Sequence, residues 1–186
     1  MAALARLCGD ASLEFIGAGM SQYYRYYDSP LGQILLTASE IKLTGLHFVG
    51  EKYYPGISAE WRLEKEHTLL NSTMVQLAEY FSGTRKQFDV PLAPQGTDFQ
   101  QQVWKSLTAL PYGTTATYGQ LAARVGSPKA VRAVGAANGR NPISIIVPCH
   151  RVIGADGSLT GYAGGLARKQ SLLQLESAKI EFRLTA

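Results

Sequence analysis

The feature that most constrains the fold is a Gly-Ser-Pro turn at residues 126–128, which lies between two short segments with helical patterns. The first segment spans 118–125. The turn ends with a serine suited to cap the second helix, 129–138, and a proline suited to its first helical position. Two short helices joined by a tight turn that contains glycine are typical of a helix-turn-helix unit.

The segment around this turn is almost free of acids. Residues 99–175 hold eight Lys or Arg and one acid, Asp156, which gives a net charge of +7. Residues 1–95 hold eight basic and ten acidic side chains, a net charge of −2. A basic stretch of this length indicates a polyanionic partner, with nucleic acid the first candidate. The alternative is a basic surface that serves solubility alone.

Composition excludes several classes of protein. The 186 residues are 46% hydrophobic and 17% charged, which is ordinary for a globular protein. No apolar run approaches the roughly 20 residues of a membrane span. The two cysteines, Cys8 and Cys149, are too few for a disulfide scaffold or a cysteine-based zinc site. We therefore expect a reduced, cytoplasmic location and no membrane association.

The chain divides into three parts. Residues 1–20 form a leader or tail to which we assign no function, because acids within its apolar stretch are unlike a signal peptide. Two prolines and a glycine between 91 and 96 mark a boundary. We therefore expect an N-terminal α/β domain at 21–95 and a C-terminal domain at 96–186.

The predicted elements make this an α+β protein with two domains. In the first domain, three apolar runs predict an antiparallel meander, followed by one helix and a fourth short strand. These elements are expected at 23–27, 34–38, 43–49, 66–81 and 88–92. In the second domain, a helix capped by Thr97 or Asp98 precedes the helix-turn-helix, whose first helix is capped by Thr117. A buried strand at 143–147, a hairpin turn at 154–157 and a helix at 166–177 complete a winged-helix arrangement.

The second helix of the pair is unusual for a reader of DNA bases. It offers mostly alanine and glycine, where a major-groove helix projects Arg, Asn or Gln. Small side chains let its backbone approach a narrow minor groove closely. Arg132 stands among these small residues. It could enter a base stack, or it could pair with an acid of the core.

A Pro-Cys-His-Arg sequence at 148–151 is the candidate chemical centre. Most isolated cysteines are inert and buried. Here His150 and Arg151 are the kind of neighbours that lower a thiol pKa and make a nucleophile. In an extended strand Cys149 and His150 would point to opposite faces, so they cooperate only if the backbone turns or a water bridges them. Glu176 is a better candidate than Asp156 to orient the histidine. The alternative is that Glu176 is simply a solvent-exposed residue of the last helix, as most such glutamates are.

The sequence around Cys149 resembles the active-site signature of the O6-alkylguanine-DNA alkyltransferases, the methylated-DNA–protein-cysteine methyltransferases. Pro148-Cys149-His150-Arg151-Val152 follows Asn141-Pro142 and an Ile/Val run. The segments 117–122, 132–135 and 161–166 also occur in the family's order and spacing. The resemblance covers about residues 97–177, and 26–32 resembles the start of the N-terminal domain of bacterial members, which is RNase H-like in the family.

The resemblance implies a role for each matching residue. Cys149 would accept the alkyl group after the damaged base is flipped out of the duplex. His150 would act as its base through a water, Glu176 would orient His150, and Asn141 would hold the turn. Tyr118 would donate toward guanine N3. The pocket would consist of Pro148, Tyr162, the Ala163 amide and the carbonyls of Cys149 and Val152.

The resemblance also implies a DNA-binding face. Arg132 would fill the vacated position in the stack, and the helix that carries Gly135 would lie in the minor groove of double-stranded DNA. The expected phosphate contacts are Lys129, Arg140, Arg124 and Arg168.

Ser144 stands where some relatives carry a proline, and this smaller residue would widen the pocket for bulkier alkyl groups. No cofactor and no metal are expected, and the protein is expected to be a monomer.

These features predict irreversible repair of O6-alkylguanine, and of O4-alkylthymine, with one transfer per protein molecule. Two alternatives stay open. A damage sensor would flip the base without transfer, although such relatives lack the acceptor cysteine. A Cys-His hydrolase would need an oxyanion hole, and its Cys and His are not normally adjacent in sequence.

Overall fold

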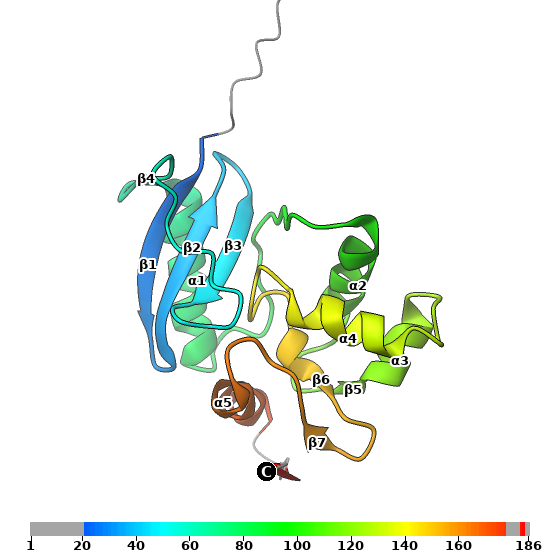
Figure 1. Cartoon of the computed structure of the whole chain (residues 1–186). Helices are drawn as coiled ribbons and strands as arrows, with labels where there is room; N and C mark the ends of the chain where they lie inside the picture. The colour runs from blue at the N-terminus through cyan, green and yellow to red at the C-terminus, as the bar shows by residue number, and fades with distance from the viewer. Residues whose placement is uncertain (1–20, 178–182, 185–186) are drawn as a thin grey trace, which may run out of the picture.

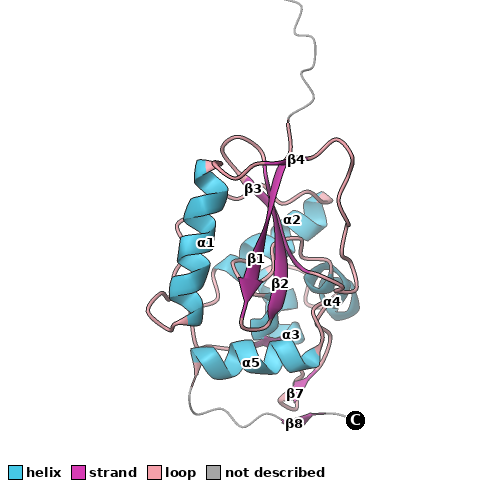
Figure 2. Ribbon diagram, turned by 90° about the vertical axis from the view of Figure 1, so that its left-hand side faces the viewer, coloured by secondary structure: helices cyan, strands magenta, loops and turns pink. Residues whose placement is uncertain are grey.

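A computed structural model describes residues 21–177 and 183–184 of the chain. Its first unit is a four-stranded sheet covered on one face by a helix (Figures 1 and 2). The strands are β1 (Tyr23–Ser29), β2 (Gly32–Ala38), β3 (Leu43–Phe48) and β4 (Arg62–Leu63), in the order β3-β2-β1-β4. β1, β2 and β3 are antiparallel neighbours, so the predicted meander is confirmed. β4 pairs parallel with β1 and was not predicted.

The helix of this unit is α1 (Thr68–Phe81), which begins two residues after the predicted start. Its buried face includes Leu70, Leu77 and Tyr80, which are all fully buried. The predicted strand at 88–92 is wrong. There Leu92 forms an isolated bridge to Leu43, because prolines at 91 and 94 have no amide hydrogen with which to continue a ladder.

The second unit consists of helices joined by short strands. Its elements are α2 (Asp98–Thr108), β5 (Ala116–Thr117), α3 (Tyr118–Arg124), α4 (Val131–Gly139), the 3₁₀ turn η1 (Cys149–Arg151), β6 (Val152–Ile153), β7 (Ser158–Leu159), α5 (Leu166–Glu176) and β8 (Arg183–Leu184). Thr97 caps α2 and Thr117 caps α3, each with a glutamine three residues later completing a capping box. Thr117 was the predicted cap of α3, and Thr97 was one of the two candidates for the cap of α2.

The helix-turn-helix of α3 and α4 is present, but α4 begins at Val131 rather than at residue 129. Its N-cap is Ala130, which offers no side-chain hydrogen bond. Ser127 is used elsewhere: its amide donates to Ala122 O and its carbonyl accepts from Ala130 N, at 2.9 Å each. The predicted cap is therefore wrong, because the backbone of Ser127 closes the turn between the helices.

The apolar run at 143–147 is buried as expected, but it is not a strand. Residues 144–146 form a turn, and Ile145 has a φ of +70°. Ile143 bridges to Leu46 of β3, and Ser144 N donates to Leu46 O at 2.9 Å. Burial alone does not separate a buried strand from a buried turn, so the sequence pattern could not settle this.

The predicted wing is only partly present. β6 pairs parallel with β5, and β7 pairs parallel with β8, so the two strands expected to form a hairpin belong to different sheets. One hydrogen bond, from Gly154 N to Ser158 O at 2.9 Å, closes the predicted turn at 154–157.

The two units share an interface to which α5 contributes. α5 lies across the end of the β1–β2 hairpin, and Figure 2 shows it below the sheet. Arg168 on α5 donates to Leu31 O in that hairpin at 2.9 Å and to Gly164 O at 3.0 Å, and its guanidinium lies 4.7 Å from the Phe48 ring centroid. Arg168 thus joins the units, which makes it less suited to bind a DNA phosphate than the other three predicted cations, whose side chains form no hydrogen bond to any described residue.

Candidate active site

A turn held by Asn141 presents Cys149. The Asn141 amide nitrogen donates to Val147 O at 2.7 Å, to Ile143 O at 3.3 Å and to Cys149 Sγ at 3.1 Å. Its amide oxygen accepts from Ile143 N at 3.0 Å. One buried side chain therefore closes the loop and contacts the sulfur at its end.

Cys149 starts the 3₁₀ turn η1, so the backbone turns where the sequence required it to turn. Cys149 is 4% exposed. Burial raises the pKa of the thiol to about 11, against the smaller lowering effect of the Asn141 hydrogen bond. The expectation of a lowered pKa is wrong for the free protein, because Arg151 faces Glu176 and burial outweighs the charges nearby.

His150 and Glu176 form a buried pair. His150 Nε2 lies 2.9 Å from Glu176 Oε1, and both side chains are at most 1% exposed. Burial lowers the pKa of His150, although the hydrogen bond and charge of Glu176 act in the opposite direction. The ring is therefore neutral at pH 7, and its second nitrogen, Nδ1, has no hydrogen-bond partner within the described part of the chain. A neutral imidazole with a free nitrogen is equipped to accept a proton.

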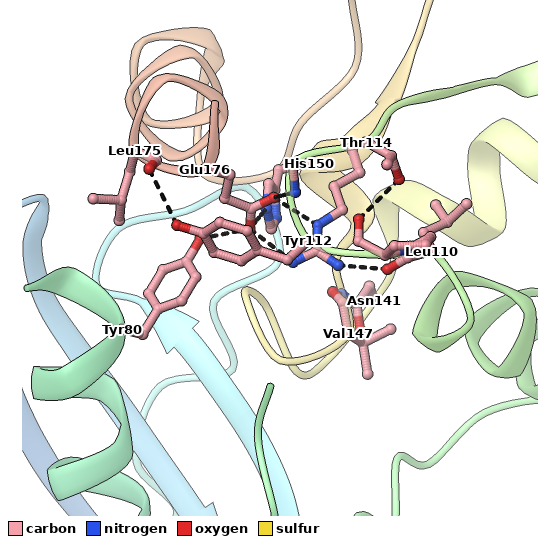
Figure 3. A network of polar contacts seen from close by, with 12 residues as sticks. Tyr80, Leu110, Tyr112, Thr114, Asn141, Val147, His150, Leu175 and Glu176 are labelled. Atoms are coloured by element: carbon pink, nitrogen blue, oxygen red, sulfur yellow. Dashed lines mark hydrogen bonds and ion pairs between the residues drawn. The ribbon is translucent and has the colours of Figure 1, made fainter. Parts of the chain in front are cut away.

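Glu176 receives four further hydrogen bonds (Figure 3). Arg151 donates to both carboxylate oxygens, at 2.7 Å and 2.8 Å. Gly113 N donates at 3.3 Å and the Tyr80 hydroxyl at 2.8 Å. Burial by itself raises the pKa of Glu176, but His150 and Arg151 outweigh it and hold the pKa well below its usual range. The carboxylate therefore stays ionised.

Tyr118 and Gly135 face each other beside the loop of residues 160–165, the pocket loop. The Tyr118 hydroxyl donates to Thr160 O at 3.1 Å and to Gly161 O at 3.3 Å. A Cβ at Gly135 would lie 3.6 Å from the Tyr118 ring, so α4 packs on the tyrosine at ordinary contact distance. Burial raises the pKa of Tyr118, and its hydroxyl keeps its proton.

The remaining predicted pocket residues are at least partly buried near these groups. Pro148 and Val152 are buried, and Tyr162 and Ala163 are half-buried. The Val152 carbonyl accepts from Lys169 Nζ at 2.5 Å, and Thr160 O accepts from the same ammonium at 2.6 Å. The Ala163 carbonyl accepts from Lys52 N of the first unit at 3.1 Å. The pocket loop is thus held from both units.

The predicted DNA-binding side chains are exposed on or beside the helix-turn-helix. They are Arg124, Lys129, Arg132 and Arg140. Arg132 forms no ion pair with any described residue, so it does not pair with a core acid, one of the two alternatives considered for it. Arg140 lies 5.4 Å from the Tyr53 ring centroid of the first unit. Exposed cations without an ion pair to any described residue, beside a helix of small residues, suit contact with a polyanion.

Neither a metal cluster nor a membrane span is found in the described ranges. No group of three or more His, Cys, Asp or Glu is placed to hold a metal ion there. No helix in them is long and apolar enough to cross a membrane.

Comparisons with known proteins match both units. The 6-O-methylguanine DNA methyltransferase DNA-binding domain matches residues 98–178, and the ribonuclease-like domain of the same family matches 22–94. This chain belongs to that family. A methylated-DNA–protein-cysteine methyltransferase of Methanosarcina acetivorans is 51% identical over 156 residues, which are 84% of this chain and 99% of the relative. One from Mycobacterium tuberculosis is 48% identical over 88% of this chain and 97% of the relative.

Solved structures agree with this placement. The crystal structure of Mycobacterium tuberculosis OGT in complex with DNA has a TM-score of 0.79 and 47% identity, and covers 84% of this chain and 93% of that chain. A structure of the O6-methylguanine methyltransferase from the same organism has a TM-score of 0.78 and 48% identity, over 86% and 95% of the two chains. The α+β fold with two family domains follows from these matches.

Three residues that contact the candidate active site were missed in the sequence. Tyr80 belongs to the apolar pattern of α1, and nothing local shows that its hydroxyl meets Glu176. Lys169 is fully buried, which is rare for a lysine and has no sequence signal here. Asn138 is 1% exposed and donates to Cys149 O at 3.4 Å. Its position on a helix end that faces the core was the one available hint.

Proposed function

We propose that the protein repairs DNA by moving the alkyl group of O6-alkylguanine to Cys149, irreversibly and once per molecule. The observation that carries the proposal is the Cys149 thiol, which meets Asn141 and stands next to a neutral His150 bound to an ionised Glu176. Membership of the methylated-DNA–protein-cysteine methyltransferase family supplies the reaction class. A thioether has no easy route back to a thiol, so one transfer ends the activity.

The chemical step begins from the thiol rather than a stored thiolate. With its pKa near 11, Cys149 keeps its proton until substrate is bound. His150 accepts that proton through a bridging water while the sulfur attacks the alkyl carbon. The S–C bond forms, the C–O6 bond breaks, and the electron pair leaves with guanine. Tyr118 donates a proton or hydrogen bond to the base, and Glu176 stabilises the imidazolium and fixes its ring.

Base flipping precedes this step, because O6 is inaccessible within the stack. We propose that α4 lies in the minor groove of double-stranded DNA and that Arg132 fills the vacated position. Lys129, Arg124 and Arg140 neutralise phosphates. The small residues of α4, including Gly135, support this placement, since they let the helix backbone approach the groove closely.

The pocket sets the substrate range. Pro148 and Tyr162 line it, while the Cys149 and Val152 carbonyls and the Ala163 amide recognise the base. We propose that O4-alkylthymine is also a substrate. Ser144, 1% exposed, leaves more room than a proline, so methyl and benzyl adducts are expected to react at similar rates. A strict methyl preference would count against this.

We further propose a cytoplasmic monomer with a winged-helix C-terminal domain, residues 96–186.

Intact-protein mass spectrometry tests the function. The protein and a Cys149→Ser variant are incubated with a duplex that carries one O6-methylguanine. A gain of one methylene on Cys149, absent in the variant, is expected. An unchanged mass with tight binding to the damaged duplex would instead indicate a damage sensor. Hydrolysis of a thiol-reactive acyl ester with turnover would indicate a hydrolase.

A further inference from the structure

The hydroxyl of Tyr80 reaches the candidate active site from the other domain. Tyr80 lies in the last turn of α1 and is fully buried. Its hydroxyl donates to Glu176 Oε1 at 2.8 Å, and the same oxygen lies 2.9 Å from His150 Nε2 (Figure 3). A helix of the N-terminal domain therefore contributes a hydrogen bond to the acid that holds the histidine.

Packing explains the ring of Tyr80 but not its hydroxyl. The ring contacts an aromatic cluster, with centroids 5.4 Å from Phe81, 5.4 Å from Phe88 and 6.2 Å from Tyr112. A phenylalanine would fill the same space. A buried hydroxyl needs a partner, and here that partner is a carboxylate that already binds Arg151 and Gly113.

We propose that Tyr80 is a positioning residue for alkyl transfer: its hydroxyl fixes Glu176 Oε1 and limits how strongly this oxygen stabilises protonated His150. The inference rests on the proposed function. Oε1 is shared by three donors, from Tyr80, His150 and Arg151. Each donor draws negative charge from the oxygen, so removing one strengthens the others. Without the hydroxyl, the imidazolium becomes more stable and the pKa of His150 rises.

The titratable groups around His150 and Glu176 allow the titration of His150 to be measured separately from theirs. His150 is faced by Glu176 and Lys169 from α5, and Arg151 and Cys149 share its own turn η1. Glu176 is also faced by Tyr80 from α1 and by Tyr112. Burial lowers the pKa of Lys169 to about 8 and raises those of Cys149 and both tyrosines. Arginine stays charged throughout. Below about pH 6.5, where Lys169 stays protonated, a change in the pH profile therefore reports on His150.

The test compares Tyr80→Phe with Tyr112→Phe. Tyr112 is a matched control, because its hydroxyl also reaches the end of α5 but donates to the backbone carbonyl of Leu175, at 3.1 Å. Single-turnover transfer rates from an O6-methylguanine duplex are measured from pH 4.5 to 7.5. For Tyr80→Phe the acid limb is expected to move to higher pH by about 0.5 to 1 unit, the equivalent of one net hydrogen bond. Tyr112→Phe is expected to leave the limb in place.

Nitrogen-15 NMR of labelled histidine provides a readout independent of transfer. The chain has three histidines, and the resonance of His150 is expected to titrate at higher pH in Tyr80→Phe. If the parent protein transfers no alkyl group, the proposed function fails, and the NMR titration still tests the role of Tyr80. The role is overturned if Tyr80→Phe keeps the parent profile and titration, or if Tyr112→Phe shifts equally. Should Tyr80→Phe not fold, p-aminophenylalanine at position 80 keeps a weaker donor, and an intermediate shift is expected.

Discussion

The amide nitrogen of Asn141 lies 3.1 Å from the sulfur of Cys149 and 2.7 Å from the carbonyl oxygen of Val147. The side chain that contacts the reactive atom thus also closes the loop that delivers it. The conformation of the loop and the position of the sulfur are therefore coupled, so a substitution of Asn141 is expected to change both.

Replacing Asn141 by alanine is expected to harm both stability and transfer. Its buried hydrogen bonds to Ile143 and Val147 would be lost, which predicts a decrease of about 2–4 kcal/mol in the free energy of unfolding. Urea unfolding and single-turnover transfer measure the two effects. Asn71→Ala is a control, since Asn71 also donates to a loop carbonyl, that of Lys65, and accepts from Arg25, but it is only half-buried. An Asn141→Ala protein as stable as this control would contradict the prediction.

Glu176→Gln is expected to lower the free energy of unfolding by about 3–5 kcal/mol, because Arg151 would be left buried without its counter-charge. Transfer is expected to fall as well. Glu79→Gln breaks the partly exposed Arg85–Glu79 pair and is expected to cost at most about 1 kcal/mol. Chemical denaturation at pH 7 checks both values, and equal losses in the two variants would argue against a special role of the buried carboxylate.

The same carboxylate predicts an acid dependence. The pKa of Glu176 is lowered in the folded protein, so its contribution to stability is present above the ordinary carboxyl pKa of 4.5 and is lost as pH falls below that value. The difference in unfolding free energy between the parent protein and Glu176→Gln should therefore shrink from pH 5 downward. A difference that stays constant between about pH 6 and 3 would contradict the assigned shift.

The buried thiol predicts slow, strongly pH-dependent alkylation by reagents. In a Cys8→Ser background, the reaction of Cys149 with iodoacetamide should rise with pH toward about 11, whereas the unfolded chain should follow the ordinary value of 9.0. Because the folded protein keeps the proton longer, the stability that the thiol adds relative to Cys149→Ser should fall as pH rises from 9 to 11. A reaction that reaches its plateau by pH 8 would show an activated thiolate instead.

Arg132→Ala is expected to separate DNA recognition from chemistry. Arg132 is exposed, so stability should change by less than about 0.5 kcal/mol. Transfer from a damaged duplex should fall on the order of tenfold or more, since each 1.4 kcal/mol lost on flipping is a factor of ten. Reaction with the free base O6-benzylguanine, which needs no flipping, should be unchanged. Lys129→Ala should instead weaken duplex binding and reduce its salt dependence. Equal losses on duplex and free base would remove Arg132 from recognition.

Much of the fold could be predicted because its signals are local. Thr97 and Thr117 cap helices with glutamines three residues away, a relation that the sequence displays directly. The meander followed from apolar runs and a turn. The Pro-Cys-His motif marked the site, and the requirement for a turn at Cys149 was met by η1. Errors arose where every residue of a segment is apolar, because such a run shows neither the alternation of a strand nor the spacing of a helix. At 143–147 a buried turn replaced the expected strand.

The sequence by itself determined the caps that start α2 and α3, the basic second half and the identity of the candidate nucleophile, because these depend on residues close along the chain. Tertiary structure alone decided the state of the site. Tyr80 and Glu176 are 96 residues apart, and their contact follows from how α1 and α5 pack. Removal from water raises the pKa of Cys149, lowers that of His150 and lowers that of Lys169. Exclusion of water depends on every element around a group, so no local pattern encodes it.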